Sequence, residues 1–149
     1  MSDQPIRVLF VCTGNSARSI LAEALLRQVG GPRFAAFSAG THPSGVHPLA
    51  ERVLDTAGID RRGLHSKAIA ELIDEPFDYV ITLCDDARAV CPVFPGADQS
   101  LHWGYTDPAS VEGDDLVRLL AFERVFTAIS ERVRQFVLIA GRSAAAGVA

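Results

Sequence analysis

The stretch VLFVCTGNSARS, Val8 to Ser19, decides the fold class and the candidate site. Its first half is an unbroken apolar run, which is typical of a parallel strand buried on both faces. The run stops at Cys12, crosses a short loop of small residues and meets Arg18. A strand, a small-residue loop and a helix in this order predict an anion-binding turn at the carboxyl end of the strand.

The rest of the chain continues this alternation of strands and helices. Apolar runs predict strands, and apolar residues at helical spacing predict helices. The predicted strands are Arg7 to Val11, Arg33 to Ser38, Phe77 to Leu83 and Ser100 to Trp103, and the predicted helices are Ser16 to Val29, His47 to Ala57 and Leu116 to Leu138. We therefore expect one α/β domain over residues 1–140, an open parallel four-stranded sheet in flavodoxin-like order with helices on both faces. The small, unpatterned segment GRSAAAGVA, residues 141–149, is expected to be a flexible tail.

Composition narrows the function classes. The chain has 149 residues and a net charge of −4, without a dense Lys/Arg face, so we expect no nucleic-acid partner. No segment has the length of a membrane span, and the start MSDQPIRVLF lacks the pattern of a signal peptide. We expect a cytoplasmic protein without a membrane partner, and a monomer. Three cysteines in such a chain indicate core thiols or redox chemistry rather than a disulfide scaffold.

The loop after the first strand has the chemistry of an oxyanion site. Gly14 and Asn15 tolerate left-handed dihedral angles, so successive amides can turn inward, and the helix that follows adds its positive end. The Arg18 guanidinium can clamp two oxyanion oxygens, and the Ser19 hydroxyl can donate to a Cys12 thiolate, the nucleophile. The expected oxyanion-binding residues are Thr13, Gly14, Asn15, Ser16, Ala17 and Arg18. The alternative is a buried strand cysteine followed by an ordinary turn.

Here the chain resembles a known family. VCTGNSARS, together with the pair Asp107–Pro108, resembles the low-molecular-weight protein tyrosine phosphatase fold from about Ile6 to Phe136. The resemblance implies that Cys12 is the nucleophile, that Arg18 binds the oxyanion and that Asp107 is the general acid. Acid catalysis agrees with this, because an expelled oxygen needs a proton. The alternative for Asp107 is a turn residue before proline.

The other two cysteines, Cys84 and Cys91, lie seven residues apart in CDDARAVC. In a rigid helix their thiols would be about 10 Å apart, too far for a disulfide, so bonding them requires this segment to unwind. Two cysteines without a nearby histidine are too few ligands for a structural metal site. The alternative is a buried strand thiol at Cys84 and a loop cap at Cys91.

The set of Cys12, Cys84 and Cys91, with HWGYTDP at His102 to Pro108, resembles the thioredoxin-coupled arsenate reductases, which share the phosphatase fold. The resemblance implies a relay in which Cys12 attacks arsenate, Cys84 attacks Cys12, and Cys91 attacks Cys84 to leave a disulfide that thioredoxin reduces. Arsenate is the implied substrate, phosphate and sulfate are competing anions, and no cofactor or metal is expected. Two alternatives remain. The first is a phosphatase with incidental extra cysteines, although the sequence DPAS lacks the aromatic residue that often follows Asp-Pro in those phosphatases. The second is an oxyanion sensor that binds without turnover.

Some reductases of this family bind potassium beside the loop, and the resemblance places that site at Asn15, Glu23 and Ser38. The fourth position falls on Lys67. We expect the Lys67 ammonium to occupy the place of the ion; the alternative is that it points to solvent. His42 and His47 frame a loop that either covers the site or lies free at the surface.

Overall fold

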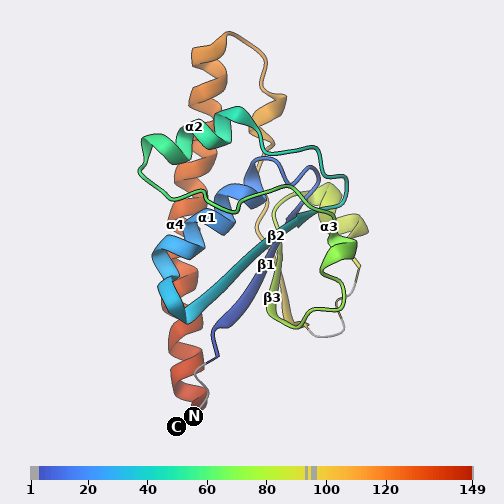
Figure 1. Ribbon diagram of the computed structural model, residues 1–149, viewed down its shortest axis with the longest axis vertical. Coiled ribbons are helices and arrows are strands. Elements are labelled where there is room, and N and C mark those ends of the chain that lie inside the picture. Colours follow the sequence, from blue (N-terminus) through green and yellow to red (C-terminus); the bar gives the residue numbers. More distant parts are fainter. Residues whose placement is uncertain (1–3, 93, 95–96, 149) are drawn as a thin grey trace.

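The fold is a twisted sheet of four parallel strands (Figure 1), seen in a computed structural model that describes residues 4–92, 94 and 97–148. The strand order is β2-β1-β3-β4, which confirms the expected fold class. The strands are β1 (Ile6–Cys12), β2 (Phe34–Gly40), β3 (Phe77–Thr82) and β4 (Ala97–His102). β1 pairs in parallel with both β2 and β3, so it lies at the centre of the sheet.

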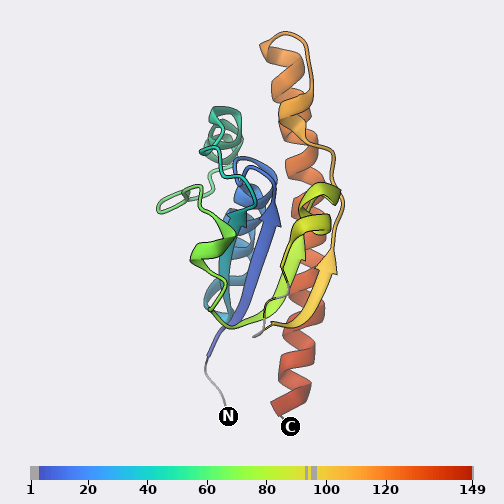
Figure 2. The ribbon, with the colours of Figure 1, turned by 90° about the vertical axis from the view of Figure 1, so that its right-hand side faces the viewer.

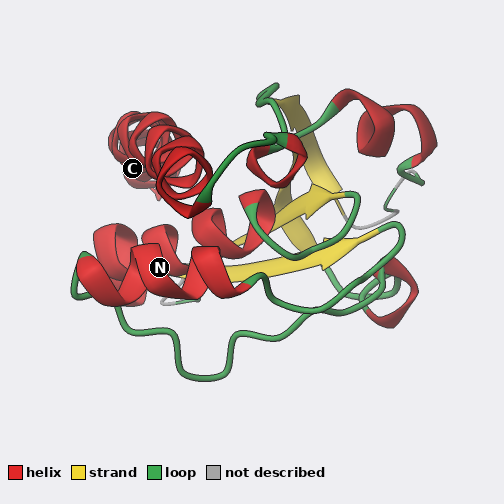
Figure 3. Ribbon diagram, turned by 90° about the horizontal axis from the view of Figure 1, so that it is seen from above, coloured by secondary structure: helices red, strands yellow, loops and turns green. Residues whose placement is uncertain are grey.

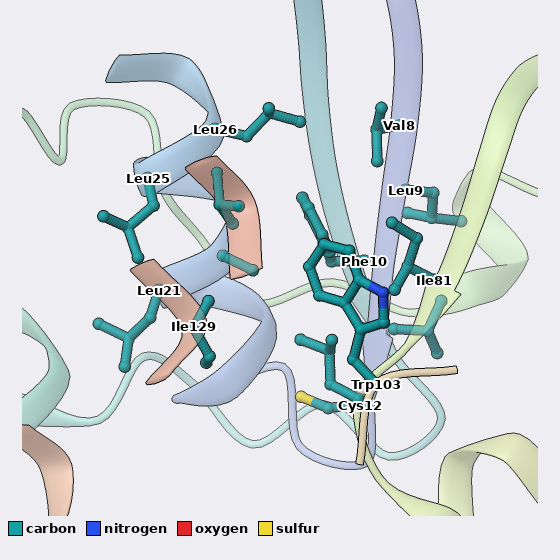
Figure 4. Packing of buried hydrophobic residues seen from close by; sticks show 14 of the residues in the cluster. Val8, Leu9, Phe10, Cys12, Leu21, Leu25, Leu26, Ile81, Trp103 and Ile129 are labelled. Carbon is teal, nitrogen blue, oxygen red and sulfur yellow. The ribbon is translucent and has the colours of Figure 1, made fainter. Parts of the chain in front are cut away.

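The central strand is buried because both of its faces are apolar. Val8, Leu9, Phe10 and Val11 have no exposed surface. Figure 4 shows Val8 and Phe10 on the side of the strand that faces Leu21 and Leu25 of α1 (Arg18–Gly30) and Ile129 of α4 (Asp115–Val148), and Leu9 on the opposite side. Trp103 lies near the strand end, and the sulfur of Cys12 lies at the margin of the cluster. The hydrophobic core therefore ends where the polar loop begins.

Helices cover both sides of the sheet. α1 and α4 pack side by side, and seen from above they lie together on one side (Figure 3). The short helix η2 (Ile69–Glu71) and α3 (Asp85–Val90) lie on the other side (Figure 1). α2 (Pro48–Thr56) contacts α4, while η1 (Gly31–Arg33) and η3 (Pro108–Ser110) are single turns that join longer elements.

The C-terminal helix is longer than the sequence predicts. The sequence predicts that the last helix ends at Leu138 and that residues 141–149 form a tail, whereas α4 continues to Val148 over 34 residues. Alanine, which follows here in a run of three, has the highest helix propensity, and no proline interrupts the segment. Ala149 lies outside the described residues. Within residues 4–148, leaving aside positions 93, 95 and 96, no helix has the length and apolar character of a membrane span.

The sheet topology brings the candidate residues together. All four strands are parallel, so their carboxyl ends lie at one edge of the sheet. Cys12 ends β1, and Cys84 follows β3 and precedes α3. Figure 2 shows α3 directly above the ends of β3 and β4. Ligands of open parallel sheets bind at this edge, next to the strand where the order reverses, which here is β1.

Candidate active site

A pocket of about 330 Å³ lies over the end of β1. Cys12, which is 2% exposed, lies in its lining. The lining residues from the loop are Cys12, Thr13, Gly14, Ser16, Ala17 and Arg18. α1 begins at Arg18, and Ala17 in the N-cap position supplies no side-chain cap, so the positive end of this helix faces the pocket. The loop is therefore shaped to bind an anion in front of the Cys12 thiol.

Asn15 is fully buried beneath the loop. The sequence predicts that its backbone amide contributes to the oxyanion nest, and this stays a prediction. Its φ of 44° is the left-handed conformation that the loop requires. Its side chain donates to Ser19 Oγ at 2.7 Å and accepts from the backbone N–H of Lys67 at 2.9 Å. The Asn15 side chain thus holds the loop from within, through Ser19 and the backbone of Lys67.

Gly40, at the end of β2, lets the loop lie close to the sheet. A Cβ at this position would lie 2.6 Å from the carbonyl oxygen of Thr13 and 2.9 Å from the backbone nitrogen of Asn15. Real Cβ atoms do not approach backbone atoms so closely. The motif at the first strand gave no indication of this requirement, because the contact joins two segments far apart in the sequence.

Arg18 and Asp107 face each other across the pocket. The Arg18 side chain is 9% exposed, and its Nη1 donates to the carbonyl oxygen of Tyr105 at 3.0 Å, which fixes the guanidinium. Its Nη2 lies 3.9 Å from Oδ2 of Asp107. The other carboxylate oxygen, Oδ1, accepts from the backbone N–H of Ala109 at the start of η3. One oxygen of Asp107 therefore anchors its turn while the other faces Arg18 and the pocket.

Residues of a second loop complete the rim. His42, Ser44 and His47 line the pocket, and their backbone N–H groups donate to carbonyl oxygens of the loop after β1. The side chains of His42 and Ser44 are exposed at its mouth. His47 caps α2, since its Nδ1 accepts from the backbone N–H of Leu49, and its ring packs on Phe122. Burial and then the nearby Arg118 lower the pKa of His47, against the opposing effect of Asp107. Burial and Arg118 therefore favour the neutral form of this imidazole beside the pocket.

The second cysteine lies against the loop that follows β1. Cys84 is buried, and its Sγ lies 3.3 Å from the hydroxyl oxygen of Thr13, the residue after Cys12. The same sulfur caps α3 by accepting from the backbone N–H of Ala87 at 3.4 Å. A hydroxyl and a backbone N–H can both donate hydrogen bonds to sulfur. The structure thus places Cys84 against the residue that follows Cys12.

Cys91 lies at the opposite end of α3. The segment between the two cysteines is helical, and all three thiols are free. The Cys91 thiol is half-buried and donates to the carbonyl oxygen of Pro92 at 3.6 Å. Burial raises the pKa of Cys91. A Cys84–Cys91 disulfide consequently requires α3 to unwind, as the sequence predicts.

Lys67 points inward. Its Nζ donates to the carbonyl oxygens of Ser38 at 2.9 Å and His65 at 3.0 Å, and lies 4.0 Å from a carboxylate oxygen of Glu23. Burial lowers the pKa of Lys67, and Glu23 opposes this effect. The hydroxyl of Ser38 donates to Glu23. The ammonium therefore lies among the groups that the sequence assigned to a cation site.

The chain is similar in sequence to a known protein family. Residues 7–145 match the model of the low molecular weight phosphotyrosine protein phosphatase family. The chain belongs to this family. Its resemblance to the arsenate reductases is also confirmed: the arsenate reductase of Halalkalibacterium halodurans is 37% identical over 129 residues, which are 87% of this chain and 93% of the relative.

Solved structures of arsenate reductases have the same fold as this chain. An arsenate reductase in a phosphate-binding state superimposes with a TM-score of 0.73 at 30% identity, covering 89% of this chain and 97% of its own. A thioredoxin-dependent arsenate reductase of Corynebacterium glutamicum gives a TM-score of 0.71 at 29% identity, covering 94% of this chain and 65% of that longer one. The match to the family therefore extends over nearly the whole domain.

Proposed function

We propose that the protein reduces arsenate to arsenite with a relay of three thiols. The observation that carries the proposal is the contact between the Thr13 hydroxyl and Cys84 Sγ, because it places a second thiol beside the loop of the nucleophilic cysteine. A hydrolytic phosphatase needs the loop, Arg18 and Asp107, but has no use for this second thiol. The arsenate reductases among the relatives support the same assignment.

In the first step the Cys12 thiolate attacks arsenic. A sulfur–arsenic bond forms and one arsenic–oxygen bond breaks, and Asp107 donates a proton so that the hydroxide leaves as water. The remaining oxygens are bound by the loop amides, the positive end of α1 and the Arg18 guanidinium, which is already fixed by Tyr105. The Ser19 hydroxyl donates to the Cys12 sulfur before the attack.

In the second step the thiolate of Cys84 attacks the sulfur of Cys12. A disulfide forms, the sulfur–arsenic bond breaks, and its electron pair stays on arsenic, which changes from As(V) to As(III) and leaves as arsenite. In the third step the thiolate of Cys91 attacks Cys84, and Cys12 leaves as a thiolate. The protein has then lost the two electrons that arsenic gained, and this oxidation is held in the Cys84–Cys91 disulfide.

A dithiol must reduce that disulfide to start another cycle. Cys91 is more exposed than the other two cysteines and lies at the end of α3, so the final disulfide forms at the most accessible thiol. Thioredoxin fits this requirement, since the Corynebacterium relative is thioredoxin-dependent. Phosphate and sulfate, which share the tetrahedral shape of arsenate, are expected to compete for the pocket.

The pocket rim distinguishes this function from that of a tyrosine phosphatase. The residue after the Asp107–Pro108 pair is Ala109, and the other rim side chains are those of His42, Ser44 and His47. These residues bound a pocket for a small oxyanion and offer no large aromatic wall for a phenyl ring. We therefore place phosphotyrosine hydrolysis second, as a weak side reaction of the same thiolate.

The experiment that tests the proposal couples the protein to thioredoxin, thioredoxin reductase and NADPH and measures arsenate-dependent NADPH oxidation. The same preparation is assayed for p-nitrophenyl phosphate hydrolysis. We expect arsenate-dependent oxidation that Cys12→Ser, Cys84→Ser and Cys91→Ser each abolish, and hydrolysis that only Cys12→Ser abolishes. Hydrolysis without any arsenate-dependent oxidation would identify a phosphatase instead.

A further inference from the structure

The imidazole of His102 joins two residues on either side of Cys84. His102 ends β4, and its Nδ1 lies 2.7 Å from the hydroxyl oxygen of Thr82, the last residue of β3. Its Nε2 lies 2.9 Å from a carboxylate oxygen of Asp85, the first residue of α3. The two residues between these contacts are Leu83 and Cys84, so the ring spans the segment that carries the second thiol of the relay.

We propose that His102 is a positioning residue that holds Cys84 at the catalytic loop while the Cys91 end of α3 unwinds. This inference rests on the relay proposed above and adds a residue to it. The ring touches neither substrate nor sulfur in the described contacts. It acts through the backbone on each side of Cys84.

We call the two hydrogen bonds of His102, to Thr82 and to Asp85, the clamp. Both bonds form with a consistent choice of donor and acceptor. The Asp85 carboxylate is an acceptor only, so Nε2 of His102 donates to it. In the neutral ring Nδ1 then accepts from the Thr82 hydroxyl. In the charged ring Nδ1 donates instead, and the Thr82 hydroxyl turns to the carbonyl oxygen of Leu101, which is 3.4 Å away. The clamp therefore holds in both protonation states of the ring.

The two ends of α3 are held unequally. At the Cys84 end, Leu83 donates to the carbonyl oxygen of Val11 and accepts from the backbone N–H of Tyr105, in addition to the His102 contacts. At the other end, the described hydrogen bonds of Cys91 are its helical bond to Ala87 and its weak thiol contact with Pro92, and its side chain packs against the core. The neighbouring Val90 is 62% exposed. Among the described residues, opening from the Cys91 end thus disrupts fewer hydrogen bonds than opening from the Cys84 end.

This difference between the two ends of α3 determines which cysteine moves during the relay. Cys84 has to stay beside the loop for the second step, and Cys91 has to travel to it for the third. Without the clamp, the first turn of α3 and Cys84 move together with the rest of the helix. Cys84 then spends less time in reach of Cys12, and the second step slows.

The experiment measures that step alone, in a Cys91→Ser background that stops the relay at the Cys12–Cys84 disulfide. Arsenate is mixed with the reduced protein, the reaction is quenched with acid at intervals, and mass spectrometry gives the rate of disulfide formation. We expect His102→Ala, which removes both hydrogen bonds, to slow it about tenfold, and Asp85→Ala about threefold. Asp85→Asn, which keeps an acceptor for Nε2, should retain most of the rate.

The matched control is Asp86→Ala, which removes an acid from the same first turn of α3, one residue further along. It should leave the rate unchanged, which separates the clamp from a helix-dipole effect. The rise in melting temperature with phosphate reports the oxyanion loop and should be the same in all variants. Asp85 is exposed, so its variants are not expected to unfold and serve as the test should His102→Ala fail to fold.

Each outcome counts for or against the clamp. Slower disulfide formation in His102→Ala and Asp85→Ala, with an unchanged phosphate effect, supports it. A parental rate in both variants, equal losses in Asp85→Ala and Asp86→Ala, or loss of the phosphate effect overturns it. If the Cys91→Ser parent itself forms no Cys12–Cys84 disulfide with arsenate, the proposed function fails and the clamp fails with it.

Discussion

The hydroxyl oxygen of Ser19 lies 2.8 Å from Sγ of Cys12. From the other side, Asn15 Nδ2 donates to the same hydroxyl, so the proton of Ser19 is directed at the sulfur. Asn15 in turn accepts from the backbone N–H of Lys67. An unbroken series of hydrogen bonds therefore runs from the backbone of Lys67 through Asn15 and Ser19 to Cys12, the proposed nucleophile.

The first prediction concerns the last bond of this series. Ser19→Ala removes the donor to Cys12 and leaves the buried Asn15 amide without its acceptor. We expect iodoacetamide to alkylate Cys12 about tenfold more slowly at pH 7, because a hydrogen bond to a charged group contributes about 1.5–3 kcal/mol. Peptide mass spectrometry measures the rate at Cys12 separately from the other thiols. Ser130→Ala, a buried serine of α4, is the control; equal rates in the two variants would contradict the account.

Gly40 carries the second prediction. In Gly40→Ala the new methyl group meets the backbone of Thr13 and Asn15, which cannot move without changing the loop. We expect a loss of stability of about 1–3 kcal/mol and at least tenfold weaker phosphate binding. Thermal melting with and without phosphate measures both effects. Gly104→Ala is the control, since its methyl would meet His102 Nε2 at an ordinary 3.5 Å; a normal phosphate effect in Gly40→Ala would argue against the close packing.

The third prediction follows from the Cys91 thiol. Burial raises its pKa above the usual 9.0, so the thiolate that attacks Cys84 is a minor species at neutral pH. Below the pKa the thiolate fraction grows about tenfold per pH unit. The conversion of the Cys12–Cys84 disulfide to the Cys84–Cys91 disulfide should therefore still be accelerating at pH 9. Acid quenching and mass spectrometry from pH 7 to 9.5 measure it. A rate that levels off near pH 7.5 would show that Cys91 is ionised far more easily.

Lys67 supplies the fourth prediction. Its ammonium already binds the carbonyl oxygen of Ser38 and lies near the carboxylate of Glu23. A potassium ion would have to displace a charge that the protein carries itself. We expect potassium and sodium at matched ionic strength to give the same melting temperature and the same arsenate affinity. A rise in melting temperature specific to potassium would show that Lys67 does not replace the ion.

Short-range patterns were sufficient for the sheet and for the first part of the site. The apolar run before Cys12 and the small residues after it predict the strand, the loop and the start of α1, because each depends on residues close in sequence. The parallel order then places Cys84 at the same edge. Arg18 and Asp107 also lie where the resemblance implies, with Nη2 and Oδ2 3.9 Å apart.

Contacts between distant segments were not predictable in this way. His47 lines the pocket because the loop before α2 folds over it, and its backbone N–H donates to the carbonyl oxygen of Ser16 in the loop after β1. The inward position of Asn15 depends on the backbone of Lys67, 52 residues further on. The clamp at His102 requires the register of β3 and β4, which a short and exposed β4 does not reveal.

The central claim is that Cys12 and Cys84 give the two electrons that reduce arsenic. The most direct test is a single turnover of reduced Cys91→Ser with excess arsenate and no added reductant. We predict one arsenite released per protein, together with a disulfide that peptide mapping assigns to Cys12 and Cys84. Full release of arsenite without that disulfide, or formation of an arsenic adduct on Cys12 that never yields arsenite, would contradict the relay.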